Sequence, residues 1–260
     1  MAKKSFLKLT VESTTLLTPN MQRIVLSGTS LAEFPQPCES GYIKLLFLPD
    51  GRPVADEASL AALNGQRPVM RTYTIRTFDA NKLTITVDFA LHGKDGHSGP
   101  ASRWASSCEA GDTICIAGPG PVKLIHPEAE WFFLAGDITA LPAISCNLEQ
   151  LPQDAKGVAI IEVPDLADQQ NLQAPAGIDI IWVTSQQALL DAALAQSWPE
   201  ADVAAWCACE FSAMRQIRQF LKTDKQLPRE KLYISSYWKQ GSSEEEHKNV
   251  KRLDAETEEA

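Results

Sequence analysis

Hydrophobic and polar residues alternate through the first half of the chain, as they do in strands that bury one face. Six such segments, separated by loops rich in Pro, Gly, Asn and Asp, span residues 6–11, 22–26, 42–48, 71–77, 82–89 and 113–117. Only residues 100–107 favour a short helix, and residues 50–69 are expected to form an extended surface loop. Six strands at this spacing predict an all-β, closed antiparallel barrel.

The pattern changes in the second half of the chain. Short apolar runs at 131–135, 157–162, 179–183, 203–208 and 231–235 alternate with helical patterns at 141–150, 187–195 and 213–222. This alternation predicts a Rossmann-like α/β domain, a parallel sheet with crossover helices. We therefore expect a barrel domain over residues 1–127 and an α/β domain over 128–241. Residues 242–260 form either a short helix or a frayed polar tail.

Composition narrows the class of protein. A hydrophobic content of 44% and a charged content of 22% fit a folded globular chain. The net charge of −9 argues against a nucleic-acid binder, because neutralising phosphates requires a basic face. No apolar run reaches membrane-spanning length and the start does not resemble a signal peptide, so we expect no membrane insertion and a cytoplasmic location.

The spacing of cysteines and histidines does not favour an iron–sulfur cluster or a protein-bound metal, so any electron transfer is expected to use an organic cofactor. The 6 cysteines lack the spacing of an iron–sulfur cluster and are expected to be buried thiols. The 4 histidines lack metal-ligand spacing, so no protein-bound metal is expected. No Ser/His/Asp triad is recognisable, and no side chain is assigned a catalytic role.

The segment Arg71-Thr72-Tyr73-Thr74 offers a guanidinium, an aromatic plane and hydroxyls from one predicted strand. These groups suit a flavin dinucleotide: Arg for the pyrophosphate, Tyr for stacking and Thr for the ring or ribityl chain. A strand with a surface Arg and a core Tyr would show the same pattern. Support comes from 99–104, GPASRW, whose composition is that of a turn opening a helix with free N–H groups for phosphate.

Two further turns are candidates for ligand contact. Gly136-Asp137-Ile138-Thr139 follows the first strand of the parallel sheet, where ligands commonly bind, although a helix N-terminus capped by Asp137 or Thr139 explains it equally well. His92 and His97 flank a glycine-rich loop that leads into Gly99, and one of them could face the flavin; a surface loop histidine is the alternative.

The order of these motifs resembles the flavin-binding barrel of the ferredoxin-reductase superfamily. Residues 131–144, WFFLAGDITALPAI, look like a signature of the siderophore-interacting proteins, which are flavin-dependent ferric-siderophore reductases, and 237–241, YWKQG, resembles their closing motif. The matched segments run in family order from Lys44 to Gly241. Ile138 stands where the family usually has Glu, and Cys209 and Ser236 stand where it usually has Gly.

The resemblance implies that the cofactor is FAD, because polar contacts extend along a whole dinucleotide. The residues expected to bind it are Arg71, Thr72, Tyr73, Thr74, Asp88, Phe89, His92, Gly99, Pro100, Ala101, Ser102, Trp104, Asp137, Thr139 and Ala140.

The resemblance also implies a ferric siderophore as substrate. Basic side chains at Lys44 and Lys239 would line its pocket, and Lys123 would complete a cationic triad that attracts the anionic complex. We expect electrons to pass through FAD to Fe(III) and Fe(II) to be released in the cytoplasm. A flavin or ferredoxin–NAD(P) reductase on the same fold, or a siderophore carrier that only binds, remains an alternative.

The electron donor is expected to be ferredoxin or NAD(P)H. Cys209 and Ser236 would narrow the approach of a nicotinamide, which predicts poor use of a pyridine nucleotide. Against this, Arg215 and Arg218 are about one helical turn apart and could grip a ribose phosphate, favouring NADPH. The alternative is that both arginines only solvate a helix face.

Overall fold

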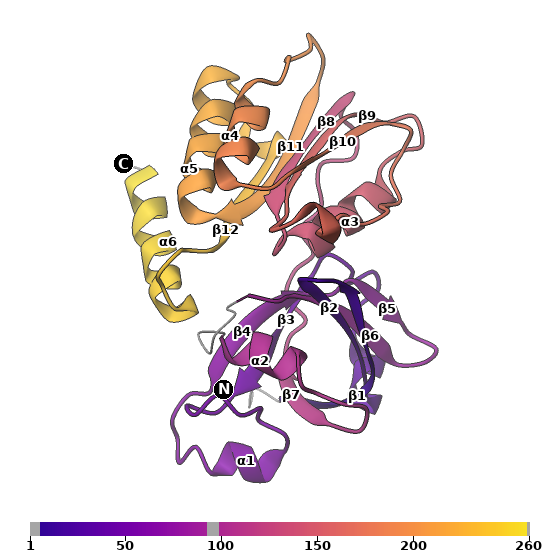
Figure 1. Cartoon of the computed structure of the whole chain (residues 1–260), viewed down its shortest axis with the longest axis vertical. Coiled ribbons are helices and arrows are strands. Elements are labelled where there is room, and N and C mark those ends of the chain that lie inside the picture. The colour runs from indigo at the N-terminus through magenta and orange to yellow at the C-terminus, as the bar shows by residue number, and fades with distance from the viewer. Residues whose placement is uncertain (1–5, 93–98, 259–260) are drawn as a thin grey trace. The chain divides into compact units, whose positions relative to one another are not determined.

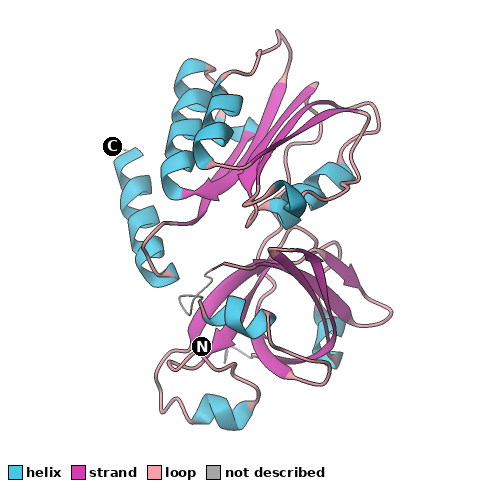
Figure 2. Cartoon of the chain, in the orientation of Figure 1, coloured by secondary structure: helices cyan, strands magenta, loops and turns pink. Residues whose placement is uncertain are grey.

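A computed structural model describes residues 6–92 and 99–258 of the chain (Figures 1 and 2). It divides into two compact units, Met1–Lys123 and Leu124–Ala260, and each unit is considered by itself. His97, one of the two loop histidines singled out in the sequence, lies outside the described residues.

The first unit is an antiparallel sheet of 7 strands in the order β4-β3-β7-β1-β2-β6-β5. The strands are β1 (Leu7–Thr18), β2 (Met21–Ser27), β3 (Tyr42–Phe47), β4 (Val69–Thr74), β5 (Thr77–Asp79), β6 (Thr84–Ala90) and β7 (Thr113–Ala117). The predicted fold class is confirmed, but the predicted count of six strands is wrong. The expected strand at 71–77 is two strands, because Ile75 N donates to Gly41 O while Arg76 N donates to Thr86 O on another strand.

The curvature of this sheet follows from its connections. Strands β4 and β5 lie at opposite ends of the strand order, yet only Ile75 and Arg76 separate them along the chain. Three consecutive Cα steps span ~11 Å at most, so the sheet must curl enough to bring the ends of its two edge strands within this distance. The side chains that alternate inward form the core of the half-barrel, including Leu9, Val11, Ile24, Leu26, Ile43, Leu45, Ile85, Val87, Phe89, Ile114 and Ile116.

Two short helices accompany the barrel. α2 (Pro100–Ala105) begins with proline, and its Ala101 and Trp104 join the barrel core. α1 (Glu57–Ala61) lies in the segment 50–69, which was expected to be an extended loop; that expectation is wrong for these residues. The helix starts from a capping box in which Ser59 N donates to the Asp56 carboxylate at 2.8 Å and Asp56 N donates to Ser59 Oγ at 3.0 Å.

The second unit is a parallel sheet of 5 strands in the order β10-β9-β8-β11-β12, which confirms the predicted α/β class. The elements are β8 (Trp131–Asp137), α3 (Leu141–Gln150), β9 (Lys156–Glu162), β10 (Gly177–Val183), α4 (Gln186–Leu194), β11 (Val203–Glu210), α5 (Phe211–Gln219) and β12 (Leu232–Trp238). α5 continues into one π-helical turn, Phe220–Asp224.

Helices cover both faces of this sheet (Figure 2). α4 and α5 pack with Phe133, Ala135 and Cys207 on one face, and α3 lies against the other. All eight residues of β11 are buried, which is why the strands read as continuous apolar runs rather than alternating ones.

The strand order contains a topological switch. From β8 the chain moves outward to β9 and β10, and it then returns to the other side of β8 at β11. In open parallel sheets, ligands bind at the carboxyl ends of the two strands that flank such a switch. Here those ends are Gly136-Asp137 and Cys209-Glu210.

The polar end of the chain forms α6 (Glu244–Glu258). Ser243 starts the helix with a capping box, since its N–H donates to the Glu246 carboxylate at 2.7 Å and Glu246 N donates to Ser243 Oγ at 3.3 Å. Among the helices of the described residues, none combines the length and apolar character needed to cross a membrane.

Candidate functional site

The predicted flavin segment on β4 presents its residues on two faces. Arg71 and Tyr73 pair in register with Leu45 and Ile43, whose side chains lie in the barrel core. Thr72 lies on the opposite face, where it is exposed. Arg71 and Tyr73 are half-buried, so the guanidinium and the aromatic ring emerge together at the rim of the barrel core. Thr74 is nearly buried.

Phe89 and Trp104 support Tyr73 from inside the barrel. The Tyr73 ring packs on Phe89 with 4.3 Å between ring centroids, and Phe89 contacts Trp104 edge-on at 5.8 Å. Phe89 is fully buried and Trp104 nearly so. Contact of Phe89 and Trp104 with FAD therefore stays a prediction. From these buried positions they would influence the cofactor by fixing the orientation of the Tyr73 ring.

Asp88 is engaged within the protein. Arg23 Nε and Nη2 each donate to one Asp88 carboxylate oxygen at 2.7 Å, forming a bidentate ion pair between β2 and β6. The Asp88 side chain is only 3% exposed. This pair joins two strands of the barrel, and the expected contact of Asp88 with FAD stays a prediction.

The start of α2 meets the end of β6 near Arg71. His92 N donates to Ser102 Oγ at 3.2 Å, and Ser102 Oγ donates to His92 O at 3.3 Å. Partial desolvation and the nearby Arg71 charge lower the pKa of His92, which keeps its imidazole neutral at pH 7. Arg71, His92 and Ser102 are thus brought to one corner, whereas Ala101 is buried in the core.

These residues fit a flavin dinucleotide. One face of Tyr73 is packed by Phe89 while the residue stays half-buried, which provides a fixed aromatic platform. Among the residues that the structure describes, a Cβ built on Gly99 would meet only His92 Cε1, at 3.8 Å, which leaves the backbone before Pro100 open to a close approach on that side. Arg71 supplies positive charge at the same corner.

Two of the three predicted substrate lysines lie on β3 or are bonded to the residues just before it. Lys44 Nζ lies 5.9 Å from the centroid of the Tyr42 ring. That ring covers Gly120 so closely that a Cβ at this position would collide with it. Ser40 Oγ donates to the carbonyl of Lys123 at 3.0 Å, which holds the Lys123 backbone beside the residues that precede β3. Lys239 belongs to the second unit, so the predicted triad stays a prediction.

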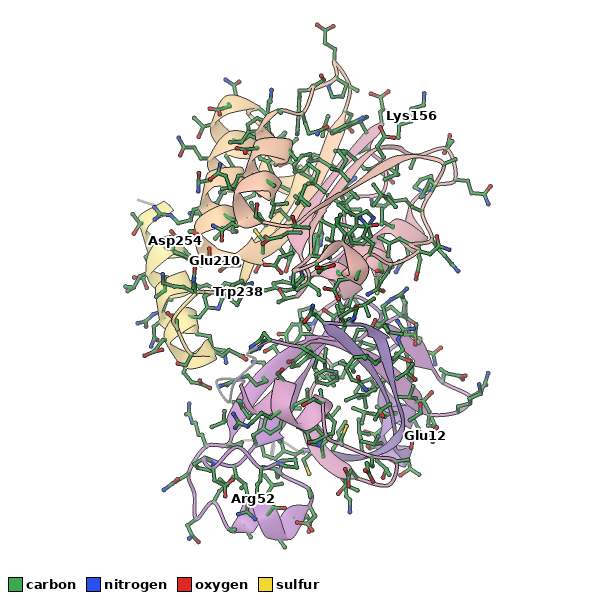
Figure 3. The ribbon with its side chains drawn as sticks, in the orientation of Figure 1. Glu12, Arg52, Lys156, Glu210, Trp238 and Asp254 are labelled. Atoms are coloured by element: carbon green, nitrogen blue, oxygen red, sulfur yellow. The ribbon has the colours of Figure 1, made fainter. Side chains whose placement is uncertain are left out.

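In the second unit, Asp137 closes the turn after β8. Its buried carboxylate accepts hydrogen bonds from Thr139 N at 2.9 Å, Thr139 Oγ1 at 2.5 Å and Trp238 Nε1 at 2.7 Å. Burial raises the pKa of Asp137, and the three donors act in the opposite direction. The predicted helix cap is wrong, because the N-cap of α3 is Ala140 and no side chain caps this helix. The Asp137 carboxylate instead holds the turn that precedes α3. Trp238, labelled in Figure 3, is anchored by its N–H yet 41% exposed.

The rest of this turn is tightly packed. Ala140 is fully buried, and its N–H donates to Asp137 O at 2.9 Å. A Cβ on Gly136 would lie 2.6 Å from Ala208 O on β11, so glycine is required where β8 and β11 meet. Thr139 is the half-buried member of the predicted set, and the contact of these residues with FAD stays a prediction.

Two acids at this edge were not predicted from sequence. Glu162 ends β9 in register with Asp137, and burial together with the Asp137 and Glu210 carboxylates raises its pKa to about 7. Glu210 ends β11, and its carboxylate caps α5 by accepting from Ser212 N at 2.5 Å and Ala213 N at 3.4 Å. The sequence did offer one sign of these acids, because each of the neighbouring strands β9, β8 and β11 ends in an acidic residue.

Lys239 lies in a cationic cavity on α5. Its Nζ is 5.4 Å from the centroid of the Phe211 ring, and Arg215 lies 6.0 Å from the same ring. The cavity measures about 530 Å³, and its lining includes Phe211, Ser212, Arg215, Arg218, Lys222 and Lys239.

Residues for metal chemistry are not gathered anywhere in the described ranges 6–92 and 99–258, where no group of three or more His, Cys, Asp or Glu side chains could hold a metal ion. The cysteines Cys38, Cys108, Cys115, Cys146, Cys207 and Cys209 are free and buried.

The fold is ferredoxin-reductase-like, and the comparisons with known proteins identify an FAD-dependent oxidoreductase. A ferredoxin–NADP⁺ reductase from Plasmodium falciparum shares this fold at a TM-score of 0.64 and 16% identity, over 90% of this chain and 97% of that one. Residues 10–123 match the siderophore-interacting FAD-binding domain, and residues 129–241 match the siderophore-interacting protein model. The chain belongs to the siderophore-interacting protein family, and its cofactor is FAD.

Individual relatives extend over nearly the whole chain. The siderophore-interacting protein SipS from Aeromonas hydrophila has 33% identity and a TM-score of 0.82, covering 96% of this chain and 97% of that one. The ferric vibriobactin reductase of Vibrio cholerae serotype O1 is 31% identical over 87% of this chain and 86% of its own length. The NADPH-dependent ferric-chelate reductase of Escherichia coli K12 is 29% identical over 90% of this chain and 92% of its own.

Proposed function

We propose that this protein is a cytoplasmic reductase that passes electrons through FAD to the iron of a ferric siderophore. The observation that carries the proposal is the pairing of β3 with β4 in the first unit. Lys44 stands in register with Thr72, between the positions of Arg71 and Tyr73 on the neighbouring strand. A cation for an anionic substrate thus lies one strand away from the flavin-binding segment, on the face of Thr72 rather than on that of Arg71 and Tyr73.

These residues suggest separate roles for the cofactor and for the side chains around it. When bound, FAD supplies the one-electron chemistry that amino-acid side chains lack. Tyr73, held by Phe89, orients the flavin ring, and Arg71 binds the pyrophosphate. Lys44 and Lys123, with Lys239 from the second unit, attract the anionic siderophore. The hard oxygen ligands of a siderophore favour Fe(III), so reduction weakens the complex and releases Fe(II) without acid–base catalysis.

The names of two relatives support this reaction class. One is a ferric vibriobactin reductase and the other an NADPH-dependent ferric-chelate reductase. The same fold also serves ferredoxin–NADP⁺ reductases, so a different electron acceptor is the alternative. For the donor, we propose NAD(P)H or a ferredoxin.

Stopped-flow mixing of the photoreduced holoprotein with an anaerobic ferric siderophore tests the proposal. Rapid reoxidation of the flavin is expected. Tight binding with the flavin still reduced would show a carrier, and reoxidation only by free flavin or ferredoxin would show one of the other reductases on this fold.

The role of Lys44 has its own test. Lys44→Glu is expected to weaken ferric-siderophore binding about tenfold and leave the FAD content unchanged, because it reverses one charge in an attractive field. Lys8→Glu, at an exposed lysine on β1, is the matched control and should bind normally. Equal affinities for the two variants would remove Lys44 from the substrate site.

A further inference from the structure

One face of α6 is turned toward the rest of the second unit. The side chains of His247, Val250, Lys251 and Asp254 are buried or half-buried, and their spacing of three, four and seven residues places them on one side of a helix. The neighbouring positions, including Lys248 and Leu253, are exposed. In Figure 1 the yellow helix α6 runs beside α5 and the end of β12.

Polar contacts hold most of this face. His247 Nε2 and Ser236 Oγ are 2.8 Å apart, and Lys251 Nζ donates to Ser235 Oγ at 2.9 Å and to Ser236 O at 3.0 Å. Val250 is the one apolar residue among the four and is only partly buried against the core. A helix attached in this way can be displaced by a ligand that competes for its polar partners.

The last of these contacts is ionic. Asp254 Oδ1 lies 3.2 Å from Arg215 Nε, and Asp254 Oδ2 lies 2.7 Å from Arg218 Nη1. One carboxylate therefore joins two guanidinium groups one turn apart on α5, and Figure 3 labels Asp254 on α6. The side chains of Arg218 and Asp254 are each 12% exposed, so this ion pair is shielded from water, whereas Arg215 is 59% exposed.

The two arginines also line the cavity of about 530 Å³ on α5, together with Lys222 and Lys239. Four basic side chains around one cavity, in a chain of net charge −9, form a site for a compact polyanion. The cavity lies along α5, which begins at the carboxyl end of β11 beside the topological switch, where nucleotides bind in this type of sheet.

We propose that Arg215 and Arg218 form the binding site for the 2′-phosphate of a phosphorylated pyridine nucleotide, and that Asp254 of α6 occupies this site as an internal competitor. A phosphate carries more charge than a carboxylate and offers three acceptor oxygens to the two guanidiniums. Binding of the donor therefore displaces Asp254 and loosens α6. This inference rests on the proposed reductase function only for the choice of ligand.

The arrangement also bears on the prediction that this protein uses a pyridine nucleotide poorly. Cys209 is fully buried in the core beneath α5, so its side chain does not narrow the approach to the sheet edge. Ser236 is also buried, and its hydroxyl is engaged by His247. The obstacle is α6 itself, held there by Ser236, Ser235 and the arginine pair.

Calorimetric titration of the oxidised holoprotein with 2′,5′-ADP tests the inference without catalytic turnover. Asp254→Asn removes the competing charge at nearly constant shape, so it should tighten 2′,5′-ADP binding about three- to tenfold and leave 5′-AMP binding unchanged. Glu256→Gln on the same helix, whose carboxylate is near Arg252 at 4.0 Å, is the matched control and should match the wild type. Adding Arg218→Ala to Asp254→Asn should abolish the gain.

Amide hydrogen exchange provides a second readout in the wild-type holoprotein. Exchange in residues 244–258 should rise when 2′,5′-ADP binds and stay constant with 5′-AMP. Unchanged 2′,5′-ADP affinity in folded Asp254→Asn, an equal gain for 5′-AMP, or a gain that survives Arg218→Ala would overturn the inference. All these results are independent of ferric-siderophore reduction, so failure of the reductase proposal is recognised separately.

Discussion

The polar groups at the barrel rim of the first unit and at the strand-end edge of the second unit differ in burial and in hydrogen bonding. At the rim, Arg71 and Tyr73 are half-buried and the backbone at Gly99 is open to a close approach. At the edge, the hydrogen-bonding groups of Asp137, Glu210 and Ser236 are buried and satisfied by neighbouring residues of the same unit. The rim thus leaves polar groups accessible to a cofactor, whereas at the edge they are engaged by side chains of the same unit that a ligand binding there would have to displace.

The largest expected effect concerns an ion pair that belongs to the barrel rather than to its rim. Arg23→Ala leaves the buried Asp88 carboxylate without its bidentate partner and should lower the free energy of unfolding of the first unit by about 2–3 kcal/mol. Chemical denaturation measures this loss. FAD affinity of the folded fraction should be unchanged; a selective loss of FAD with normal stability would instead place Asp88 in the cofactor site.

Arg71→Ala removes the guanidinium that is proposed to bind the FAD pyrophosphate at the barrel rim. Loss of a charge-assisted bond to the pyrophosphate should cost about 1.5–3 kcal/mol, which is roughly a 10- to 150-fold drop in FAD affinity. Flavin fluorescence titration of the apoprotein measures it, and Arg67→Ala, at an exposed arginine just before the same strand, serves as control. If both variants bound FAD equally well, Arg71 would not bind the pyrophosphate.

Glu162→Gln tests the closed edge through its pH dependence. The folded-state pKa of about 7 lies above the ordinary value of 4.5, so between these values the folded protein holds a proton that the unfolded chain has released. The free energy of unfolding therefore falls as the pH rises through this window. The substituted amide cannot ionise, so the variant should be more stable than the wild type by about 1–2 kcal/mol at pH 8 and similar to it at pH 5.

Thermal denaturation across pH 5–8 measures this difference, with Glu200→Gln at an exposed position as control. A constant difference between Glu162→Gln and the wild type at every pH would contradict the crowding of carboxylates at the edge.

The same contrast explains what the sequence could predict. Alternation and apolar runs located the strands, because burial of one or both faces is a local property of the pattern; β7 and α3 begin and end where expected. The break at Ile75 and Arg76 was not predictable, since it depends on hydrogen bonds to two different segments. α1 was missed because a capping box, not an apolar period, starts it.

The residues of the candidate site also separate into those that the sequence could predict and those that it could not. Arg71 and Tyr73 could be proposed from residue type and strand position alone. The commitment of Asp88 to Arg23, 65 residues away, and of Asp254 to Arg215 and Arg218 could not, because each depends on tertiary contacts between distant segments. Glu162 and Glu210 gave a weak signal as strand-end acids, which becomes meaningful only once the strand order is known.

The most direct test of the central claim is a count of iron. Photoreduced holoprotein is mixed anaerobically with excess ferric siderophore and an Fe(II)-specific chromogenic chelator, and flavin absorbance and Fe(II) are recorded together. Because FAD stores two electrons and Fe(III) takes one, the account predicts full return of the oxidised flavin with about two Fe(II) per FAD. Binding of the siderophore with the flavin still reduced and no Fe(II) formed would contradict it.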